Sequence, residues 1–168
     1  GIDVSGIRIS NRAHVVLPYH CEMDGYIEEL KGDNKVGTTK NGIGPCYADR
    51  DNRIGIRVCD FIDKEEFAKR LKENLELKNM EIVKLYGKEP MDYESMLKEY
   101  EGYADRLRPY VCDTIALLHD ELKADRKILF EGAQATMLDI DYGTYPYVTA
   151  SHPISGGIGV GAGVAPRD

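Results

Sequence analysis

The stretch DKEEFAKRLKENLEL, residues 63–77, predicts a helix with one buried face. Asp63 is a favourable N-cap, and Glu66 stands at the third helical position, where it would complete a capping box. An apolar residue recurs every four positions, which is the spacing of one face of a helix: Phe67, Leu71 and Leu75. We therefore expect a helix that begins after Asp63 and packs this stripe into a core.

A second helix is predicted after Asp92, because six residues that follow it share one helical face: Tyr93, Met96, Leu97, Tyr100, Ala104 and Leu107. Pro109 stops or kinks this helix and can start a third one, which would run to about Lys123. On either side of the helices lie two short apolar runs that predict strands, AHVVLPYH at 13–20 and KILFEGA at 127–133. This order of elements is typical of an α/β domain with a parallel sheet.

Composition excludes several classes of function. The chain has 168 residues, of which 42% are apolar, and its net charge is −7. No cluster of Lys and Arg is dense enough to bind nucleic acid, and no apolar run is long enough to span a membrane. The four cysteines form no Cys-x-x-Cys pair, which favours reduced thiols and a cytoplasmic protein.

The segment VGTTKNGIGPCYADRDNRIGIRV, residues 36–58, predicts a loop over most of its length. Its glycines allow backbone N–H groups to approach an anion, and Thr38, Thr39 and three arginines add donors and positive charge. Gly37 and Gly42 have the spacing of a P-loop, but Ile43 stands in place of the lysine. A site for a monophosphate is therefore favoured over a triphosphate site, and a solvated turn is the alternative.

A second candidate loop is EGAQATMLDIDYGTYPYVTAS, residues 131–151, which follows the second predicted strand. Ligands of α/β sheets bind beyond the carboxyl ends of strands. Gln134 lies there, and its amide can donate and accept hydrogen bonds, as reading the edge of a planar base requires. Ordinary hydrogen bonding within the loop is the alternative role for Gln134. The run GIGVGA, residues 157–162, is only a weak dinucleotide-binding signal.

These two loops and the glycine run after them resemble adenylosuccinate synthetase, and the likeness extends from RISNRAHVVLPYH to GVGAGVAPR. The resemblance implies part of a P-loop-NTPase-like, mostly parallel sheet with a helical segment between strands. It also implies an enzyme that joins IMP to L-aspartate in purine biosynthesis, using GTP and Mg²⁺. The family phosphorylates the 6-oxygen of IMP, and aspartate then displaces the phosphate.

The resemblance implies a role for each of five residues. Thr38 and Thr39 match threonines of the IMP loop, and Thr149 matches a threonine on the 5′-phosphate of IMP. Gln134 matches a glutamine at the purine 6-oxygen. Arg53 matches an arginine that reaches across a homodimer interface to the partner's IMP phosphate.

Other features of the family have no match in this sequence. The GTP-phosphate loop, the catalytic aspartate and histidine, and the ligands of Mg²⁺ are not found in residues 1–168. We therefore expect a central fragment of a single synthetase domain, with a helical subdomain at 63–123 and no activity of its own. The alternative is a stand-alone module that binds a nucleoside monophosphate or dimerises without catalysis. Lys40 and Asn41 replace residues that are often glycine and arginine, so position 40 is expected to be less flexible.

Overall fold

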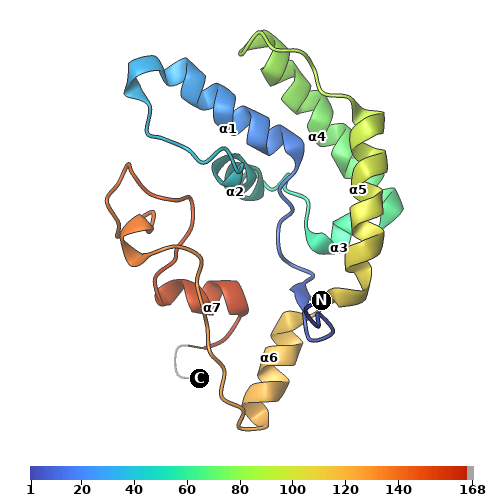
Figure 1. Cartoon of the computed structure of the whole chain (residues 1–168), viewed down its shortest axis with the longest axis vertical. Coiled ribbons are helices and arrows are strands. Elements are labelled where there is room, and N and C mark those ends of the chain that lie inside the picture. The colour runs from blue at the N-terminus through green and yellow to red at the C-terminus, as the bar shows by residue number, and fades with distance from the viewer. Residues whose placement is uncertain (166–168) are drawn as a thin grey trace. The chain divides into compact units, whose positions relative to one another are not determined.

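The computed structural model describes residues 1–165 and is mostly helical (Figure 1). The chain divides into two units. Residues Arg12–Val111 form one, here called the helical unit, and residues Gly1–Asn11 with Cys112–Asp168 form the other, here called the terminal unit. The single domain and the helical subdomain expected from the sequence stay predictions.

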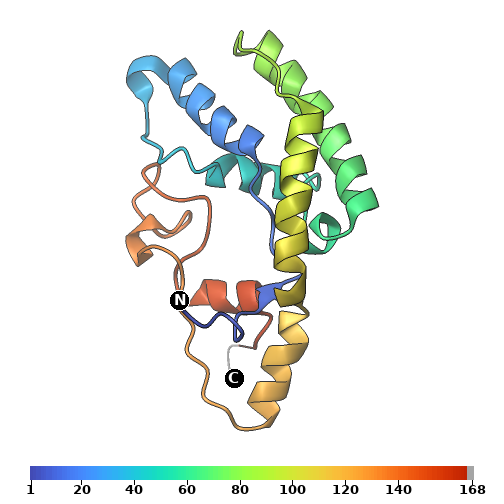
Figure 2. The ribbon, with the colours of Figure 1, turned by 45° about the vertical axis from the view of Figure 1, so that its right-hand side comes forward.

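The helical unit contains five α-helices and two short 3-10 helices. They are α1 (Pro18–Lys31), η1 (Gly32–Asn34), α2 (Ile43–Asp51), α3 (Val58–Phe61), α4 (Lys64–Lys84), α5 (Tyr93–Leu107) and η2 (Arg108–Tyr110). Figures 1 and 2 both show α4 and α5 side by side, and α2 packs beside α1.

The core of the helical unit is built around the stripe that the sequence predicted on α4. Phe67, Leu71 and Leu75 are no more than 2% exposed. The ring of Phe67 meets that of Phe61 edge to face, with their centroids 5.0 Å apart, a favourable geometry for aromatic pairs. The other members of the core come from α1, α5 and the segment before α3: Leu17, Tyr19, Ile56, Met96 and Ala104.

The helices predicted after Asp63 and Asp92 are confirmed, and both aspartates cap as expected. Asp63 accepts hydrogen bonds from the backbone N–H groups of Glu65 and Glu66, and Asp92 accepts one from Ser95. The capping box predicted with Glu66 is not formed, because the N–H of Asp63 donates to the carbonyl of Asp60 and the side chain of Glu66 accepts a hydrogen bond from Arg70 at 2.6 Å. The apolar face of α5 also packs against the core as predicted, except for its last member, Leu107, which is 39% exposed.

The terminal unit contains helices α6 (Thr114–Lys123) and α7 (Gly156–Ala162) and the 3-10 helix η3 (Thr136–Leu138). Strand β1 (Ile9–Ser10) pairs with β2 (Val111–Cys112) in a two-stranded sheet. The glycine-rich tail packs on α6, because the ring of His119 hydrogen bonds to the carbonyl of Gly163 at 3.0 Å and Val164 is buried.

The strand predicted at residues 13–20 is wrong. His14 forms only an isolated antiparallel bridge with Arg57, and α1 begins at Pro18. Proline is favoured in the first turn of a helix because its missing N–H is not needed there. The apolar run therefore leads into the first turn of α1 and does not form a strand.

The strand predicted at residues 127–133 is also not formed. A strand needs a neighbour on at least one side, and within residues 1–165 no strand pairs with this segment. It runs without regular secondary structure, and Leu129 is 93% exposed.

The third helix begins later than predicted. Residues 108–110 form only a 3-10 turn around Pro109, and the next two residues pair with β1. Helix α6 then starts at Thr114, where the carboxylate of Asp113 caps it by accepting N–H bonds from Ile115 and Ala116.

The segment predicted as a long loop, residues 36–58, contains α2 and the start of α3. The buried face of α2 consists of Pro45, Cys46 and Asp49. These residues have helical spacing, but one is proline and another is an acid, so the pattern did not stand out as an apolar stripe. Among the described residues, no helix is long and apolar enough to cross a membrane.

Two glycines give a matched test of this packing. Gly42 has a φ of 72°, and a Cβ there would lie 2.8 Å from the backbone of His20 and Cys21. Gly42→Ala should therefore lower the free energy of unfolding in urea by more than 1 kcal/mol, through steric overlap and left-handed strain. Gly102 lies on the exposed side of α5 with no atom near its Cβ position. Gly102→Ala should raise the same free energy by roughly 0.5–1 kcal/mol.

Candidate functional site

The five predicted site residues lie in two loops, one in each unit. Thr38, Thr39 and Arg53 flank α2 in the helical unit, with the threonines before the helix and the arginine after it. Gln134 and Thr149 lie in the long loop between α6 and α7 of the terminal unit. In each unit, the predicted residues therefore lie on one stretch of the chain.

Helix α2 is fixed by three buried charged or polar side chains from three helices. Asp49 of α2 is fully buried, and its two carboxylate oxygens have different partners. Oδ2 lies 3.0 Å from Nε2 of His20 on α1, and Oδ1 lies 2.6 Å from Nζ of Lys78 on α4. The cluster thus joins α1, α2 and α4 at one point.

Hydrogen bonding also fixes the tautomer of His20. The backbone N–H of Leu17 donates to Nδ1 of His20 at 2.9 Å, so Nδ1 carries a lone pair. The proton of the neutral ring is then on Nε2, which donates it to Asp49. The ring therefore joins the start of α1 to α2.

The partners of Asp49 keep it ionised. Burial opposes the charge, but the contacts with His20 and Lys78 outweigh burial and hold the pKa of the Asp49 carboxyl below its usual value. A carboxyl with a lowered folded-state pKa stabilises the fold above its unfolded pKa of about 4. This stabilisation is lost as the pH falls through the folded-state pKa.

Arg53 lies in a tight turn directly after α2. Its φ is 64°, in the left-handed region that few residues other than glycine adopt. The backbone carbonyl of Asp49 accepts N–H bonds from both Ile54 and Gly55, each at 3.0 Å, and the N–H of Arg53 donates to Arg50. The backbone of the turn is thus anchored, whereas the guanidinium-bearing side chain is exposed.

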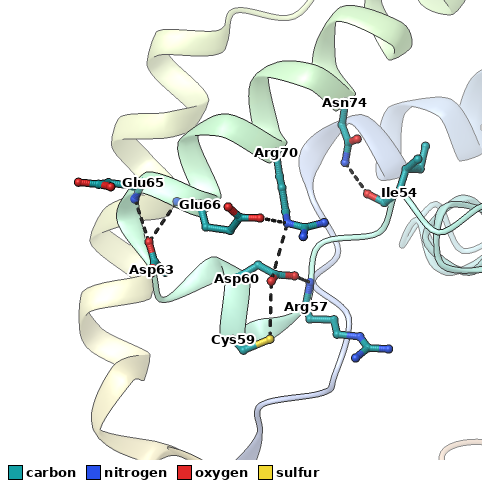
Figure 3. A network of polar contacts seen from close by, with 9 residues as sticks. All are labelled: Ile54, Arg57, Cys59, Asp60, Asp63, Glu65, Glu66, Arg70 and Asn74. Carbon is teal, nitrogen blue, oxygen red and sulfur yellow. Dashed lines mark hydrogen bonds and ion pairs between the residues drawn. The ribbon is translucent and has the colours of Figure 1, made fainter.

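Helix α4 holds the chain that continues from this turn (Figure 3). The side-chain amide of Asn74 donates to the carbonyl of Ile54 at 2.7 Å. One turn earlier, Arg70 pairs with Asp60, whose carboxylate also accepts the N–H of Arg57 at 2.9 Å. The segment that follows Arg53 is therefore bound to α4, the helix whose Lys78 also binds Asp49.

The loop before α2 follows α1 back toward its start. The hydroxyl of Thr38 donates to Oδ2 of Asp24 on α1 at 2.7 Å, and Thr38 is half-buried. Thr39 is exposed. Lys40 has a left-handed φ of 57°. The two threonines that the sequence grouped together are thus in different environments.

In the terminal unit, Gln134 is exposed and has a φ of 74°, again in the left-handed region. Nearby, Gly132 lies close to the carbonyl of Pro153, only 3.2 Å from the position of an added Cβ. The two ends of the loop therefore approach each other beside Gln134.

Asp139 organises the interior of this loop and is fully buried. Its Oδ1 accepts backbone N–H bonds from Asp141 and Tyr142, and its carboxylate lies 3.3 Å from Nδ1 of His152. Burial opposes the charge, but these hydrogen bonds outweigh it and hold the pKa of Asp139 below its usual value. The N–H of Thr149 donates to the carbonyl of Leu138, so Thr149 is held beside this turn.

Sequence analysis missed the residues that hold these loops in place, namely Asp24, Asp49, Lys78 and Asp139. None of the four was singled out from the sequence. One signal was present for Asp49, which stands three residues after Cys46 and four after Pro45 on one helical face. A face that includes a carboxylate needs a buried partner, and nothing local to the sequence identifies Lys78, 29 positions away.

The described residues do not fit a metal site. Over residues 1–165, no group of three or more His, Cys, Asp or Glu side chains is arranged to hold a metal ion. No ligand set for Mg²⁺ can therefore be assigned to this stretch of the chain.

Comparison with known proteins identifies the family. The family model of adenylosuccinate synthetase matches residues 1–168. Adenylosuccinate synthetases from Brachyspira hyodysenteriae and Lactobacillus delbrueckii subsp. bulgaricus are 55% and 56% identical to the chain. The alignments cover 99% and 98% of this chain but 39% and 38% of those proteins. The chain therefore belongs to the adenylosuccinate synthetase family and spans about two fifths of the length of these relatives.

A solved structure gives the same result for the fold. The fully ligated adenylosuccinate synthetase from Plasmodium falciparum superposes with a TM-score of 0.87 at 37% sequence identity. The match covers 95% of this chain and 37% of that one. The predicted α/β fold class is confirmed, and along the chain helices α1 to α5 follow strand β1 and precede strand β2.

The buried cluster around Asp49 gives a test of how α2 is held. Asp49→Asn should lower the free energy of unfolding by roughly 3–5 kcal/mol, because Lys78 is left buried without a counter-charge. Asp51→Asn is the matched control, since Asp51 is on the same helix but exposed, and it should change the value by less than about 0.5 kcal/mol. Urea unfolding at pH 7 measures both.

The pH dependence gives a second readout for the same cluster. The unfolding free energy of the unmodified chain should fall as the pH drops below about 4, and Asp49→Asn should fall less steeply. If Asp49→Asn does not fold, the double variant Asp49→Asn with Lys78→Met should restore folding by removing the unpaired charge. Equal stability of the Asp49 and Asp51 variants would contradict the anchoring role.

Proposed function

We propose that the chain forms the central IMP-binding portion of an adenylosuccinate synthetase, the GTP-dependent ligase of purine (AMP) biosynthesis. In this proposal the complete enzyme joins IMP and L-aspartate to give adenylosuccinate and releases GDP and phosphate. GTP and Mg²⁺ are held by residues outside those described here. The proposed location is the cytoplasm, and the proposed active form is a homodimer.

One structural observation supports this assignment most directly. Only four residues other than glycine have a positive φ in the described part of the chain: Lys40, Arg53, Asp125 and Gln134. Such conformations cost of order 1–3 kcal/mol, persist where the surrounding structure determines them, and cluster at functional sites. Arg53 and Gln134 are two of the residues assigned to IMP, and Lys40 adjoins Thr39. Three of the four strained positions therefore lie at or next to residues of the proposed site, and the fourth, Asp125, follows the end of α6.

The proposed roles follow the chemistry of each side chain. Thr38 and Thr39 belong to the IMP loop, Thr149 contacts the 5′-phosphate of IMP, and Arg53 reaches the phosphate bound by the partner subunit. Gln134 donates its amide N–H to the purine 6-oxygen, where negative charge develops when the base loses its N1 proton. A donor aimed at developing charge stabilises the transition state more than the ground state. The segment alone should form no adenylosuccinate, because it supplies neither a catalytic base nor a GTP site.

Gln134→Met in a complete synthetase that contains this sequence tests the catalytic role. It should lower turnover on the order of a hundredfold, about 2.7 kcal/mol, with a smaller effect on IMP binding. Gln134→Glu should be worse, because its carboxylate repels the developing oxyanion. Steady-state kinetics and a thermal melt are measured on the same protein. A lower melting temperature with unchanged turnover per folded molecule would instead mean that Gln134 only braces the loop.

Variants of Arg53 distinguish an effect on IMP binding from an effect on folding. Arg53→Leu should weaken IMP binding in the complete enzyme by roughly 2–5 kcal/mol, and Arg53→Lys should recover only part because lysine lacks the planar fork. Arg53→Gly should weaken binding as much as leucine does, yet raise the free energy of unfolding by about 1 kcal/mol, since glycine relaxes the left-handed turn. An IMP Michaelis constant that is unchanged in the leucine variant would exclude the role.

A further inference from the structure

Two carboxylates of α1 hold the loop that precedes α2. Asp24 and Glu28 are four residues apart, so they lie on one face of the helix. Glu28 is buried, and its Oε2 accepts the N–H of Gly37 at 2.9 Å. Oδ2 of Asp24 accepts both the hydroxyl of Thr38 at 2.7 Å and the N–H of Gly42 at 3.1 Å. Both ends of the loop are thus bound to α1.

The loop follows α1 along its length in reverse. After Gly37 at Glu28 and Thr38 at Asp24, the side chain of Lys40 passes about 3.9 Å from the Cβ position of Gly25. Gly42 then reaches the backbone of His20 and Cys21. Figure 1 shows this segment between the end of α1 and the start of α2. The loop therefore packs along helix α1 back toward the start of that helix.

Thr38 has no hydroxyl capacity left for a phosphate. Its Oγ1 donates its one proton to Asp24 and accepts the N–H of Lys40 at 3.0 Å. A phosphate oxygen is an acceptor and needs a donor. Thr38 could serve it only by breaking the bond to Asp24. Thr39 carries the adjacent hydroxyl and is exposed.

The backbone of the loop requires this external support. Gly37, Lys40 and Gly42 all have positive φ values, of 92°, 57° and 72°. Glycine adopts such values readily, but the left-handed φ of Lys40 costs free energy, and it persists where surrounding contacts determine it. Most of the loop is exposed, so the bonds to Asp24 and Glu28 are the main contacts available for this purpose.

We propose that Asp24, with Glu28, is a positioning residue for the phosphate loop, and that Thr38 shapes the loop while Thr39 presents its hydroxyl to the ligand. This inference rests on the proposed IMP site and divides the work between two adjacent threonines. The Asp24 carboxylate does not touch IMP. It fixes the backbone so that Thr39 and the loop N–H groups are placed before the phosphate arrives, which lowers the entropy lost on binding.

The test uses a complete synthetase that contains this sequence, with IMP as the varied substrate. Asp24→Ala should raise KM for IMP about tenfold, which corresponds to the loss of one strong hydrogen bond. The value of kcat should stay within about twofold of that of the unmodified enzyme. Asp24→Asn should recover most of the affinity, because its amide oxygen accepts the same two bonds. Glu22→Ala is the control, because Glu22 is exposed on the same helix. This substitution removes the same charge and should leave KM unchanged.

Variants of Thr38 test the link between the two residues. Thr38→Val should reproduce the rise in KM, Thr38→Ser should restore affinity, and Asp24→Ala with Thr38→Val should be little worse than either alone. In the unliganded enzyme, Asp24→Ala should speed amide hydrogen exchange at Gly42 without speeding exchange in α4. A purely structural role would lower the melting temperature and leave KM for IMP unchanged.

The possible failures can be told apart. An unmodified enzyme that does not bind or turn over IMP would refute the proposed function. An active enzyme in which Asp24→Ala leaves KM unchanged, or lowers it by removing a charge that repels the phosphate, would refute the positioning role alone. Additive effects of Asp24→Ala and Thr38→Val would show that the two residues act independently, and would also overturn the proposal.

Discussion

The arrangement of the helical unit depends on one buried carboxylate, that of Asp49. One carboxylate oxygen of Asp49 binds His20 at the start of α1, and the other binds Lys78 on α4. The backbone carbonyl of Asp49 accepts the N–H groups that close the Arg53 turn. Burying charge is costly unless each charged atom has a partner, so the three helices are constrained together. Local geometry at Arg53 therefore depends on buried side chains of α1 and α4.

The two candidate loops use the same physical device. Each has a buried or half-buried aspartate that accepts several donors from its own surroundings, Asp24 before α2 and Asp139 after η3. In the first loop Thr38, which is assigned to IMP, donates directly to Asp24, and in the second loop Thr149 is held near Asp139 through the carbonyl of Leu138. Structural acids thus hold the backbone, while exposed neutral or basic side chains remain free to contact a ligand.

Sequence patterns predicted what is local. The stripe on α4 and the caps at Asp63 and Asp92 follow from helical spacing and from short-range hydrogen bonding, and they were confirmed. Predictions failed where the outcome depends on distant partners. Residues 127–133 have the composition of a strand, yet a strand requires a neighbour, and α2 was missed because its buried face contains an acid whose counter-charge is far along the chain. Both candidate loops were singled out from their composition and position, and the resemblance assigned roles to their residues, whereas the residues that support the loops were not identified.

The unpaired run at residues 127–130 has a practical consequence for handling this chain. An extended apolar segment with free N–H and C=O groups is a template on which a second chain can add a strand. Ile128 and Phe130 are half-buried, but Leu129 is almost fully exposed. Purified segment should therefore self-associate with rising concentration and bind dyes that report β-aggregates. A lysine at position 129 should act as a gatekeeper and keep the segment monomeric for spectroscopy.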